Sequence, residues 1–220
     1  MRPTIVAILA TPMGVMPLPQ VANQNAAVAA LVRRRAVADG FRQSADSNPL
    51  VHVGRDDLTA WSEEPMRTVM AEMLRGIVSV ARSVNRFAPG EFEALTVQAR
   101  AEYVIVRRDG GLGVRNHPMT AWTGLYCVEA PAPAPERPDS GQLRIYESRM
   151  RNMFADATTD SMAVPFRPGH YGWTLVPGVL VVFPGGLMHE IAPVRGDGDL
   201  LVLTVRARFL APGQKGVTGW

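Results

Sequence analysis

Four histidines are the residues of this chain most suited to chemistry: His52, His117, His170 and His189. An imidazole titrates near neutral pH and is a common metal ligand. The single cysteine, Cys127, excludes an internal disulfide and a cysteine-rich zinc site. The sequence contains no P-loop, no Gly-x-Ser-x-Gly motif and no Rossmann-type glycine pattern after a strand. We therefore set aside structural zinc, nucleotide hydrolysis and the α/β-hydrolase mechanism.

Two of these histidines stand beside expected strands. His117 follows the glycine-rich turn at 110–113, and His189 follows an apolar stretch that ends in Phe183-Pro184 and a tight turn. A β-barrel needs such a turn to direct an imidazole into its mouth. A histidine at a strand end is also commonly structural, so both interpretations stay open at this point.

The elements that must position these side chains belong to a chain of ordinary globular composition. Its 220 residues are 47% hydrophobic and 20% charged, with a net charge of +3; at roughly 150 residues per domain this predicts about one domain. No apolar run reaches the ~20 residues of a membrane span. Arg2, Pro12 and Pro17 make the N-terminus a poor signal peptide. We expect a cytoplasmic protein with neither a membrane nor a nucleic-acid partner.

Residues 1–95 predict helices. Asn23 or Asn25 can cap a helix that ends at Gly40, and a second helix is expected to start near Ser62. Apolar residues of the second helix, several of them methionines, repeat at i, i+3 and i+4 spacing over 66–78. This methionine-rich face is expected to be core rather than a metal site.

Beyond residue 95 the hydrophobic period changes from 3.6 to 2, which predicts strands. The candidate strands are 97–105, 122–128, 143–146, 174–176, 179–183 and 200–209. Short strands divided by Gly/Pro turns favour a β-sandwich or barrel. We therefore predict a single domain over 1–220, of the α+β class and mainly β, with a helical portion (1–95) packed against a β-barrel (96–212).

Several motifs then resemble those of a known family. The segments 115–118, 123–127, 141–149 and 177–184, followed by His189, resemble in order the patterns His-x-His-Pro, Ser-Gly-x-Tyr-Tyr, Gly-x-Leu-x-Phe-x-Asp-Pro-Arg and Pro-x-x-Gly-x-Leu-x-x-Phe-Pro, with several positions replaced. These patterns are typical of a small bacterial and phage subgroup of the 2-oxoglutarate/Fe(II)-dependent oxygenases. The resemblance implies a double-stranded β-helix, which is a jelly-roll or cupin-like barrel.

The resemblance also implies a metal site. Enzymes of this class hold Fe(II) with two imidazoles and one carboxylate on one face of an octahedron. The matching residues here are His117, His189 and Glu147, where the subgroup has an aspartate. Glu147 could instead be a surface acid paired with Arg144 or Arg149. No catalytic residue beyond these metal ligands is expected.

The first histidine of the His-x-His pair is replaced by Arg115. If that position is a metal ligand in the family, this chain has lost one ligand and gained a cation beside the metal.

The co-substrate 2-oxoglutarate requires an arginine that holds its carboxylate. The usual register, ten to twelve residues past the distal histidine, holds Asp199, Leu200 and Leu201 here. The remaining candidates are Arg206 and Arg208, farther along the same strand, and Arg149. Arginine suits this task because its planar guanidinium binds a carboxylate through two parallel hydrogen bonds.

For the substrate we expect contacts from Trp122, Tyr126 and His170, although aromatic residues in strands are usually core. Arginines in the segment 149–167 hint at an anionic substrate. The N-terminal helices are a candidate homodimer surface.

The sequence thus predicts an Fe(II)/2-oxoglutarate-dependent oxygenase that hydroxylates a small molecule or a peptide side chain. Two alternatives remain. One is a cupin-like metalloenzyme, such as a dioxygenase or isomerase, that does not use 2-oxoglutarate. The other is a catalytically inactive barrel that serves as a binding module, for which Arg115 is the best argument.

Overall fold

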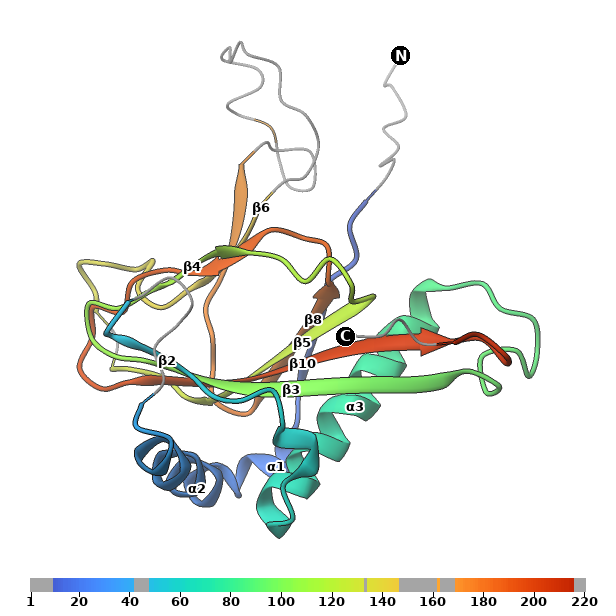
Figure 1. Ribbon diagram of the computed structural model, residues 1–220. Coiled ribbons are helices and arrows are strands. Elements are labelled where there is room, and N and C mark those ends of the chain that lie inside the picture. Colours follow the sequence, from blue (N-terminus) through green and yellow to red (C-terminus); the bar gives the residue numbers. More distant parts are fainter. Residues whose placement is uncertain (1–9, 42–47, 133, 147–161, 163–168, 216–220) are drawn as a thin grey trace, which may run out of the picture.

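Two antiparallel sheets face each other in the computed structural model (Figure 1), which describes residues 10–41, 48–132, 134–146, 162 and 169–215. The larger sheet has the order β1 (Gly14–Pro17), β8 (Val179–Pro184), β5 (Trp122–Glu129), β10 (Leu200–Leu210), β3 (Thr96–Val106) and β2 (Val51–Val53). The smaller sheet has the order β4 (Leu112–Arg115), β9 (His189–Ile191), β6 (Leu143–Tyr146) and β7 (His170–Trp173). Apart from β6 and β7, successive strands from β3 onward alternate between the sheets, as in a jelly roll.

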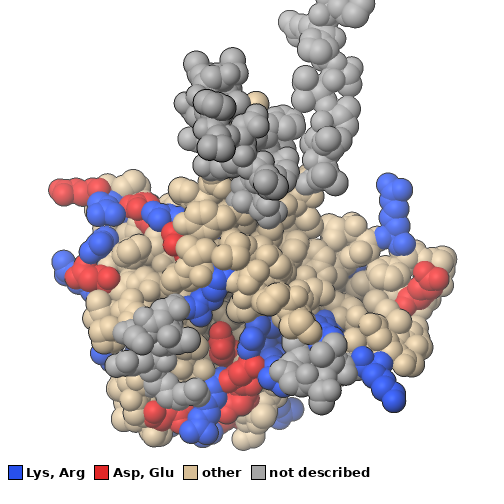
Figure 2. Space-filling model, turned by 45° about the horizontal axis from the view of Figure 1, so that its top comes forward, with Lys and Arg blue, Asp and Glu red and all other residues tan. Residues whose placement is uncertain are grey.

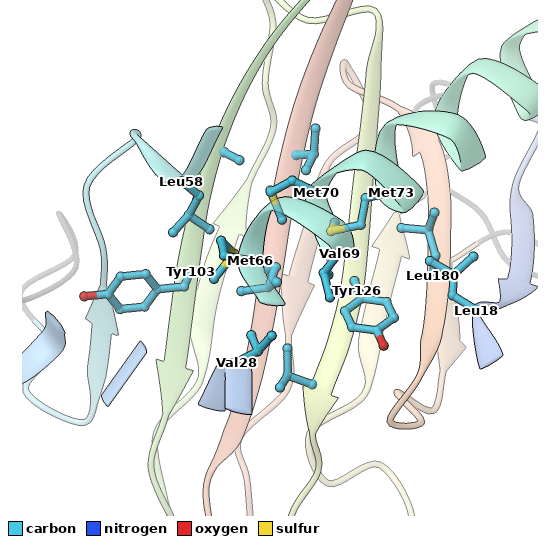
Figure 3. Packing of buried hydrophobic residues seen from close by; sticks show 14 of the residues in the cluster. Leu18, Val28, Leu58, Met66, Val69, Met70, Met73, Tyr103, Tyr126 and Leu180 are labelled. Atoms are coloured by element: carbon cyan, nitrogen blue, oxygen red, sulfur yellow. The ribbon is translucent and has the colours of Figure 1, made fainter. Parts of the chain in front are cut away.

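The helices lie on the outer face of the larger sheet (Figure 1). They are α1 (Pro19–Ala22), α2 (Asn25–Ala38) and α3 (Glu64–Val84), with a short 3₁₀ turn at Leu58–Ala60. The predictions of α2 and α3 are confirmed. The methionine-rich face of α3 is buried against β5 and β8, as expected for core residues (Figure 3). None of the helices described is long and apolar enough to cross a membrane.

Each face of the larger sheet has its own hydrophobic core. On β10, Leu201, Leu203 and Val205 point toward the helices. Leu200 and Val202 alternate with them and pack with residues of the smaller sheet. This alternation follows from the two-residue period of a strand. The face that carries Leu200 and Val202 is called the inner face below, because it looks toward the smaller sheet.

Four of the predicted strands are confirmed at 97–105, 122–128, 143–146 and 200–209, and 179–183 is confirmed as β8. The strand expected at 174–176 was wrong, because these residues lead into the turn at Pro177-Gly178, and the strand lies at His170–Trp173 instead. His170 is therefore the first residue of a strand. The N-terminal portion also contributes β1 and β2, which the sequence analysis did not predict. Both are edge strands that exist through long-range pairing with β8 and β3.

Candidate functional site

The structure brings His117 and His189 together where the two sheets meet. Their ring centroids are 5.2 Å apart and their planes are inclined by 53°. His189 is the first residue of β9 and is 3% exposed, whereas His117 lies in the loop that follows β4. Phe183 at the end of β8 packs edge-on against His189, with 5.0 Å between ring centroids. The larger sheet therefore supports the histidine pair directly.

The turn after β8 holds the loop of His117 in place. The backbone N–H of His117 donates to the carbonyl of Gly185 at 2.7 Å, and the N–H of Gly185 donates to the carbonyl of Ala121 at 3.1 Å. A Cβ on Gly185 would lie 2.5 Å from the carbonyl oxygen of Thr120. Only glycine allows the two backbones to approach so closely.

Gly185→Ala is therefore expected to reduce the free energy of unfolding by about 1–3 kcal/mol, because backbone atoms must move to relieve the overlap. The neighbouring Gly186 is a matched control, since a Cβ there meets nothing within 4 Å. Urea unfolding of both variants checks the prediction. Equal stability of the two variants would show that the loop of His117 is not held by this contact.

Both imidazoles of the pair are neutral in this environment. Burial lowers the pKa of His117 to about 3, with further contributions from the nearby His189, Arg206 and Arg115. Burial also lowers the pKa of His189, and Arg115 adds to this effect, while a hydrogen bond to the Leu187 carbonyl opposes it. A neutral imidazole is the form that binds metals.

The hydrogen bond to Leu187 also determines the tautomer of His189. Its Nδ1 lies 2.9 Å from the Leu187 carbonyl oxygen, which can only accept, so Nδ1 carries the proton. Nε2 is then left with a free lone pair. This is the arrangement of a metal-binding histidine, whose other ring nitrogen is held by a backbone carbonyl or carboxylate.

The predicted third ligand, Glu147, and the predicted co-substrate residue Arg149 lie outside the described residues. Within the described ranges, no group of three or more His, Cys, Asp and Glu side chains is placed to hold a metal ion. The histidine pair thus fits two of the three protein ligands of a non-haem iron site.

Arg115 stands directly beside the pair. It is opposite His189 in the β4–β9 ladder, and directly opposed residues share one face of a sheet. Its Nε donates to the Gly113 carbonyl at 3.3 Å. The positive charge of Arg115 lowers the pKa of both histidines, and the same charge opposes the binding of a cation.

The inner face of the larger sheet carries polar residues at the same end as the histidines. Arg206 on β10 is opposite Thr123 on β5, which in turn is opposite Phe183. Thr123 is fully buried, and its Oγ1 and the Nε of Arg206 have no hydrogen-bond partner among the described residues. Arg208 lies on the same face two residues farther along β10.

Two acidic side chains engage Arg206. Its Nη2 lies 2.5 Å from Oδ1 of Asp56, in the segment after β2, and 3.9 Å from Oε2 of Glu102 on β3. These contacts leave Arg206 about one quarter exposed. Elsewhere on the face shown in Figure 2, acidic and basic side chains are interspersed rather than gathered by sign.

The three residues expected to contact substrate do not meet at the histidine pair. Trp122 and Tyr126 lie on the helix-facing side of β5, in the core between the larger sheet and the helices. Figure 3 shows Tyr126 in this core. The Tyr126 hydroxyl donates to Oδ1 of Asn25 at 2.8 Å, and burial raises its pKa to about 12. His170 pairs with Tyr146 on the face of the smaller sheet opposite to His189.

The sequence analysis missed other residues that do share the face of His189. The β9–β6–β7 register aligns His189, Ile145 and Tyr171 in one row. Trp173, two residues after Tyr171, packs into the inner core. The two-residue spacing of Tyr171 and Trp173 indicates that both side chains lie on the same face of a strand. Only the pairing of β7 with β6 shows that this face looks toward the larger sheet.

Cys127 is a buried residue on the inner face of β5, where it packs in the core between the two sheets. Burial raises the pKa of its thiol to about 12, and the nearby Glu129 adds to this. Because the thiolate is the reactive form, we expect the native protein to resist a thiol reagent such as dithionitrobenzoate at pH 8 and to react fully in urea. Rapid reaction of the native protein would contradict the burial of Cys127.

No family model matches the chain, and no curated protein matches its sequence. Solved structures do match its fold. A prolyl-4-hydroxylase from Pseudomonas putida is 16% identical, with a TM-score of 0.60 over 90% of this chain and 93% of the other.

Two further structures are similar over the same share of this chain. HygX from Streptomyces hygroscopicus, solved with nickel and 2-oxoglutarate bound, is 12% identical, with a TM-score of 0.58 over 90% of this chain and 83% of its own. SnoK, a non-haem α-ketoglutarate-dependent carbocyclase from nogalamycin biosynthesis, is 14% identical, with a TM-score of 0.61 over 90% of this chain and 79% of its own. The motifs are confirmed in predicting a mainly β, jelly-roll type of fold with two antiparallel sheets: the chain has the fold of the 2-oxoglutarate- and Fe(II)-dependent oxygenases.

Proposed function

We propose that the protein is a non-haem Fe(II)/2-oxoglutarate-dependent oxygenase that hydroxylates a small molecule or a peptide side chain. The observation that carries this proposal is the pair of neutral imidazoles at the junction of the two sheets, the buried His189 and the partly buried His117. The fold shared with such oxygenases supports it. We further propose that the two sheets close as a double-stranded β-helix.

In this proposal His117 and His189 bind the iron, and Glu147 supplies the carboxylate. Bound Fe(II) together with 2-oxoglutarate supplies the oxidising power, so the protein contributes binding, orientation and exclusion of water. Phe183 shields one side of His189, and the Leu187 carbonyl keeps its Nδ1 protonated. Both contacts hold the Nε2 lone pair in a fixed direction.

Arg206 is the residue we propose for the carboxylate of the 2-oxo acid, with Arg208 beside it. The Nε of Arg206 and the Oγ1 of Thr123 are donors on the inner face that have no hydrogen-bond partner within the described ranges. Buried donors nearly always have partners, so an anion that accepts from both would complete the site. Arg149 remains a further candidate.

Asp56 competes with such an anion for Arg206. Asp56→Asn is therefore expected to tighten 2-oxoglutarate binding by about three- to tenfold, because the carboxylate that now pairs with Arg206 is removed. Asp57→Asn is the matched control, since Asp57 accepts from Nε1 of Trp61 rather than from Arg206. Titration calorimetry of the metal-loaded protein measures both. Weaker binding in Asp56→Asn would mean that Asp56 positions Arg206 for its ligand.

The substrate class is proposed from the fold neighbours. One neighbour is a prolyl hydroxylase in complex with a peptide fragment of hypoxia inducible factor, and HygX has been solved with hygromycin B bound. A protein of this fold therefore accommodates either a peptide or a small molecule. Arg115, Arg206 and Arg208 lie on inward-facing rows and favour an anionic group.

One observation favours a second candidate, a cupin-like metalloenzyme that does not use 2-oxoglutarate. Leu200 and Leu201, at the register where an arginine was expected, are buried in the two hydrophobic cores. Neither position can hold a carboxylate. In a cupin-like metalloenzyme of this kind, His117 and His189 would bind the metal and no 2-oxo acid would be needed.

An anaerobic titration with Fe(II) and then 2-oxoglutarate tests the proposal and separates the candidates. We expect a weak visible metal-to-ligand charge-transfer band that appears only when both are present. Binding of Fe(II) without a band on addition of 2-oxoglutarate would favour the cupin-like candidate. Failure to bind Fe(II) at all would identify a barrel that has lost its metal and serves as a binding module.

A further inference from the structure

The row of side chains that contains His189 ends at Tyr171 on β7. Neither the proposed metal site nor the proposed 2-oxoglutarate site involves this residue. Across the smaller sheet, Ile145 on β6 is opposite His189 on one side and Tyr171 on β7 on the other. Directly opposed residues of antiparallel strands project to the same face. With neighbouring strands about 4.8 Å apart, Tyr171 lies about 10 Å from His189 along this row.

Tyr171 and Trp173 form a paired aromatic surface at this place. Their ring planes are inclined by only 27°, with centroids 6.4 Å apart. Trp173 packs partly into the inner core, whereas Tyr171 remains 42% exposed although its row faces inward. One ring is thus anchored and the other is accessible to a ligand.

The indole of Trp173 carries an unused donor. Its Nε1 is buried and has no hydrogen-bond partner in the part of the chain that the structure describes. An indole N–H can only donate, and a buried tryptophan N–H usually finds an acceptor. The group that completes this site must therefore bring an acceptor.

We propose that Tyr171 and Trp173 form the substrate-binding surface of the protein, and that they take an organic ring that carries a hydrogen-bond acceptor such as a carbonyl. The inference rests on the proposed function for the place of the reaction, at His117 and His189. Aromatic side chains stack favourably on the rings of ligands. Because the adjoining Ile145 is apolar, the ring of the ligand needs no charge. Ile145 lies between the aromatic pair and His189, where the reacting part of the substrate would pass.

Benzamide is a suitable probe, because it combines a planar ring with a carbonyl acceptor. It is titrated into the metal-free protein labelled with ¹⁵N, and the indole N–H signals of the tryptophans are followed by NMR. We expect the Trp173 indole signal to move with a dissociation constant of about 1–10 mM, which is typical of a fragment of this size. The Trp61 signal should not move, because Trp61 lies on the helix side of the sheet and donates to Asp57.

Two variants test the separate contributions. Trp173→Phe keeps a ring and removes the donor, and is expected to weaken benzamide binding by about three- to tenfold, the value of one hydrogen bond. Trp61→Phe is the matched control and should bind like the wild type. A Trp173 signal that does not move up to about 20 mM benzamide would overturn the inference, as would unchanged affinity in Trp173→Phe.

Paramagnetic Mn(II) separates this inference from the proposed function. If Mn(II) binds at the histidine pair, we expect it to broaden the proton signals of bound benzamide, and His189→Ala should abolish the broadening. Benzamide could shift the Trp173 indole signal while its own proton signals stay sharp in the presence of bound Mn(II). This result would show that the benzamide ring does not lie near the metal, and it would contradict the proposal that Tyr171 and Trp173 bind the substrate. Failure of Mn(II) and Fe(II) to bind, with the benzamide shift intact, would refute the proposed function alone.

Discussion

His189→Ala and His117→Ala are each expected to weaken Fe(II) binding by about a hundredfold or more, since loss of even an outer-shell partner costs about 10–100-fold. Each variant removes one of the two neutral imidazoles that face each other at 5.2 Å. The contacts of His189 with Phe183 and with the Leu187 carbonyl hold its imidazole in place. We therefore expect no neighbouring side chain to take its place as a ligand in the alanine variant. Anaerobic equilibrium dialysis against Fe(II) measures the loss.

The matched control for this prediction is His170→Ala. His170 is an exposed histidine of the smaller sheet that lies on the face opposite to His189. The His170→Ala variant should therefore have the Fe(II) affinity and the thermal stability of the wild type. If His170→Ala lost as much affinity as His189→Ala, or if His189→Ala retained the wild-type affinity, the metal site would not be at the His117–His189 pair.

Arg115→Ala is expected to tighten Fe(II) binding by about tenfold, because it removes a positive charge beside a dication in a partly buried site. Burial is the main cause of the lowered pKa of both histidines, and the positive charge of Arg115 adds to it. Arg115→His should tighten binding further, since it replaces the repelling charge by a potential ligand in the His189 row. Equilibrium dialysis at two ionic strengths checks both variants.

Arg108→Ala is the control for the loss of one positive charge. Arg108 is an exposed residue that pairs with Asp197, away from the histidine row. It is expected to change Fe(II) affinity by less than about twofold at physiological ionic strength, because salt screens exposed charges beyond about 8 Å. Weaker binding in Arg115→Ala would instead mean that Arg115 orients His189 or holds the acidic ligand.

These two predictions address different consequences of one arrangement. The chain has two neutral imidazoles close together, one buried and one partly buried, and an arginine lies directly opposite the buried one. In the proposed metal site, this positive charge is expected to weaken metal binding relative to a histidine at position 115. The Arg115 variants measure the size of that effect.

Several features followed from the sequence alone. The helical period of residues 66–78 predicted α3 and its buried methionines, because a helix must place i, i+3 and i+4 residues on one side. The two-residue period predicted β3, β5 and β10, and the ordered motifs around His117 and His189 indicated the fold and singled out the two histidines that the structure brings together. Each of these signals is local, or is carried by the order of motifs along the chain.

The tertiary structure decided which face of its sheet each side chain points to. Nearly every residue of β5 is buried on one face or the other, so the sequence of this strand does not show which face looks inward. Trp122 and Tyr126 proved to face the helices, and Thr123, which was not predicted, faces the histidines. Hydrophobic alternation identifies a face only when the other face is polar.

The sequence determined which residue types the site contains, and the pairing of distant strands decided which of them meet. β7 is four residues long and shows its inward face only through its pairing with β6, which joins Tyr171 to the row of His189. Arg206 approaches Asp56 because β10 lies beside β3, and the segment after β2 follows the edge of β3. These contacts join residues that are far apart in the sequence, 26 positions for Ile145 and Tyr171 and 150 for Asp56 and Arg206, and no local pattern encodes them.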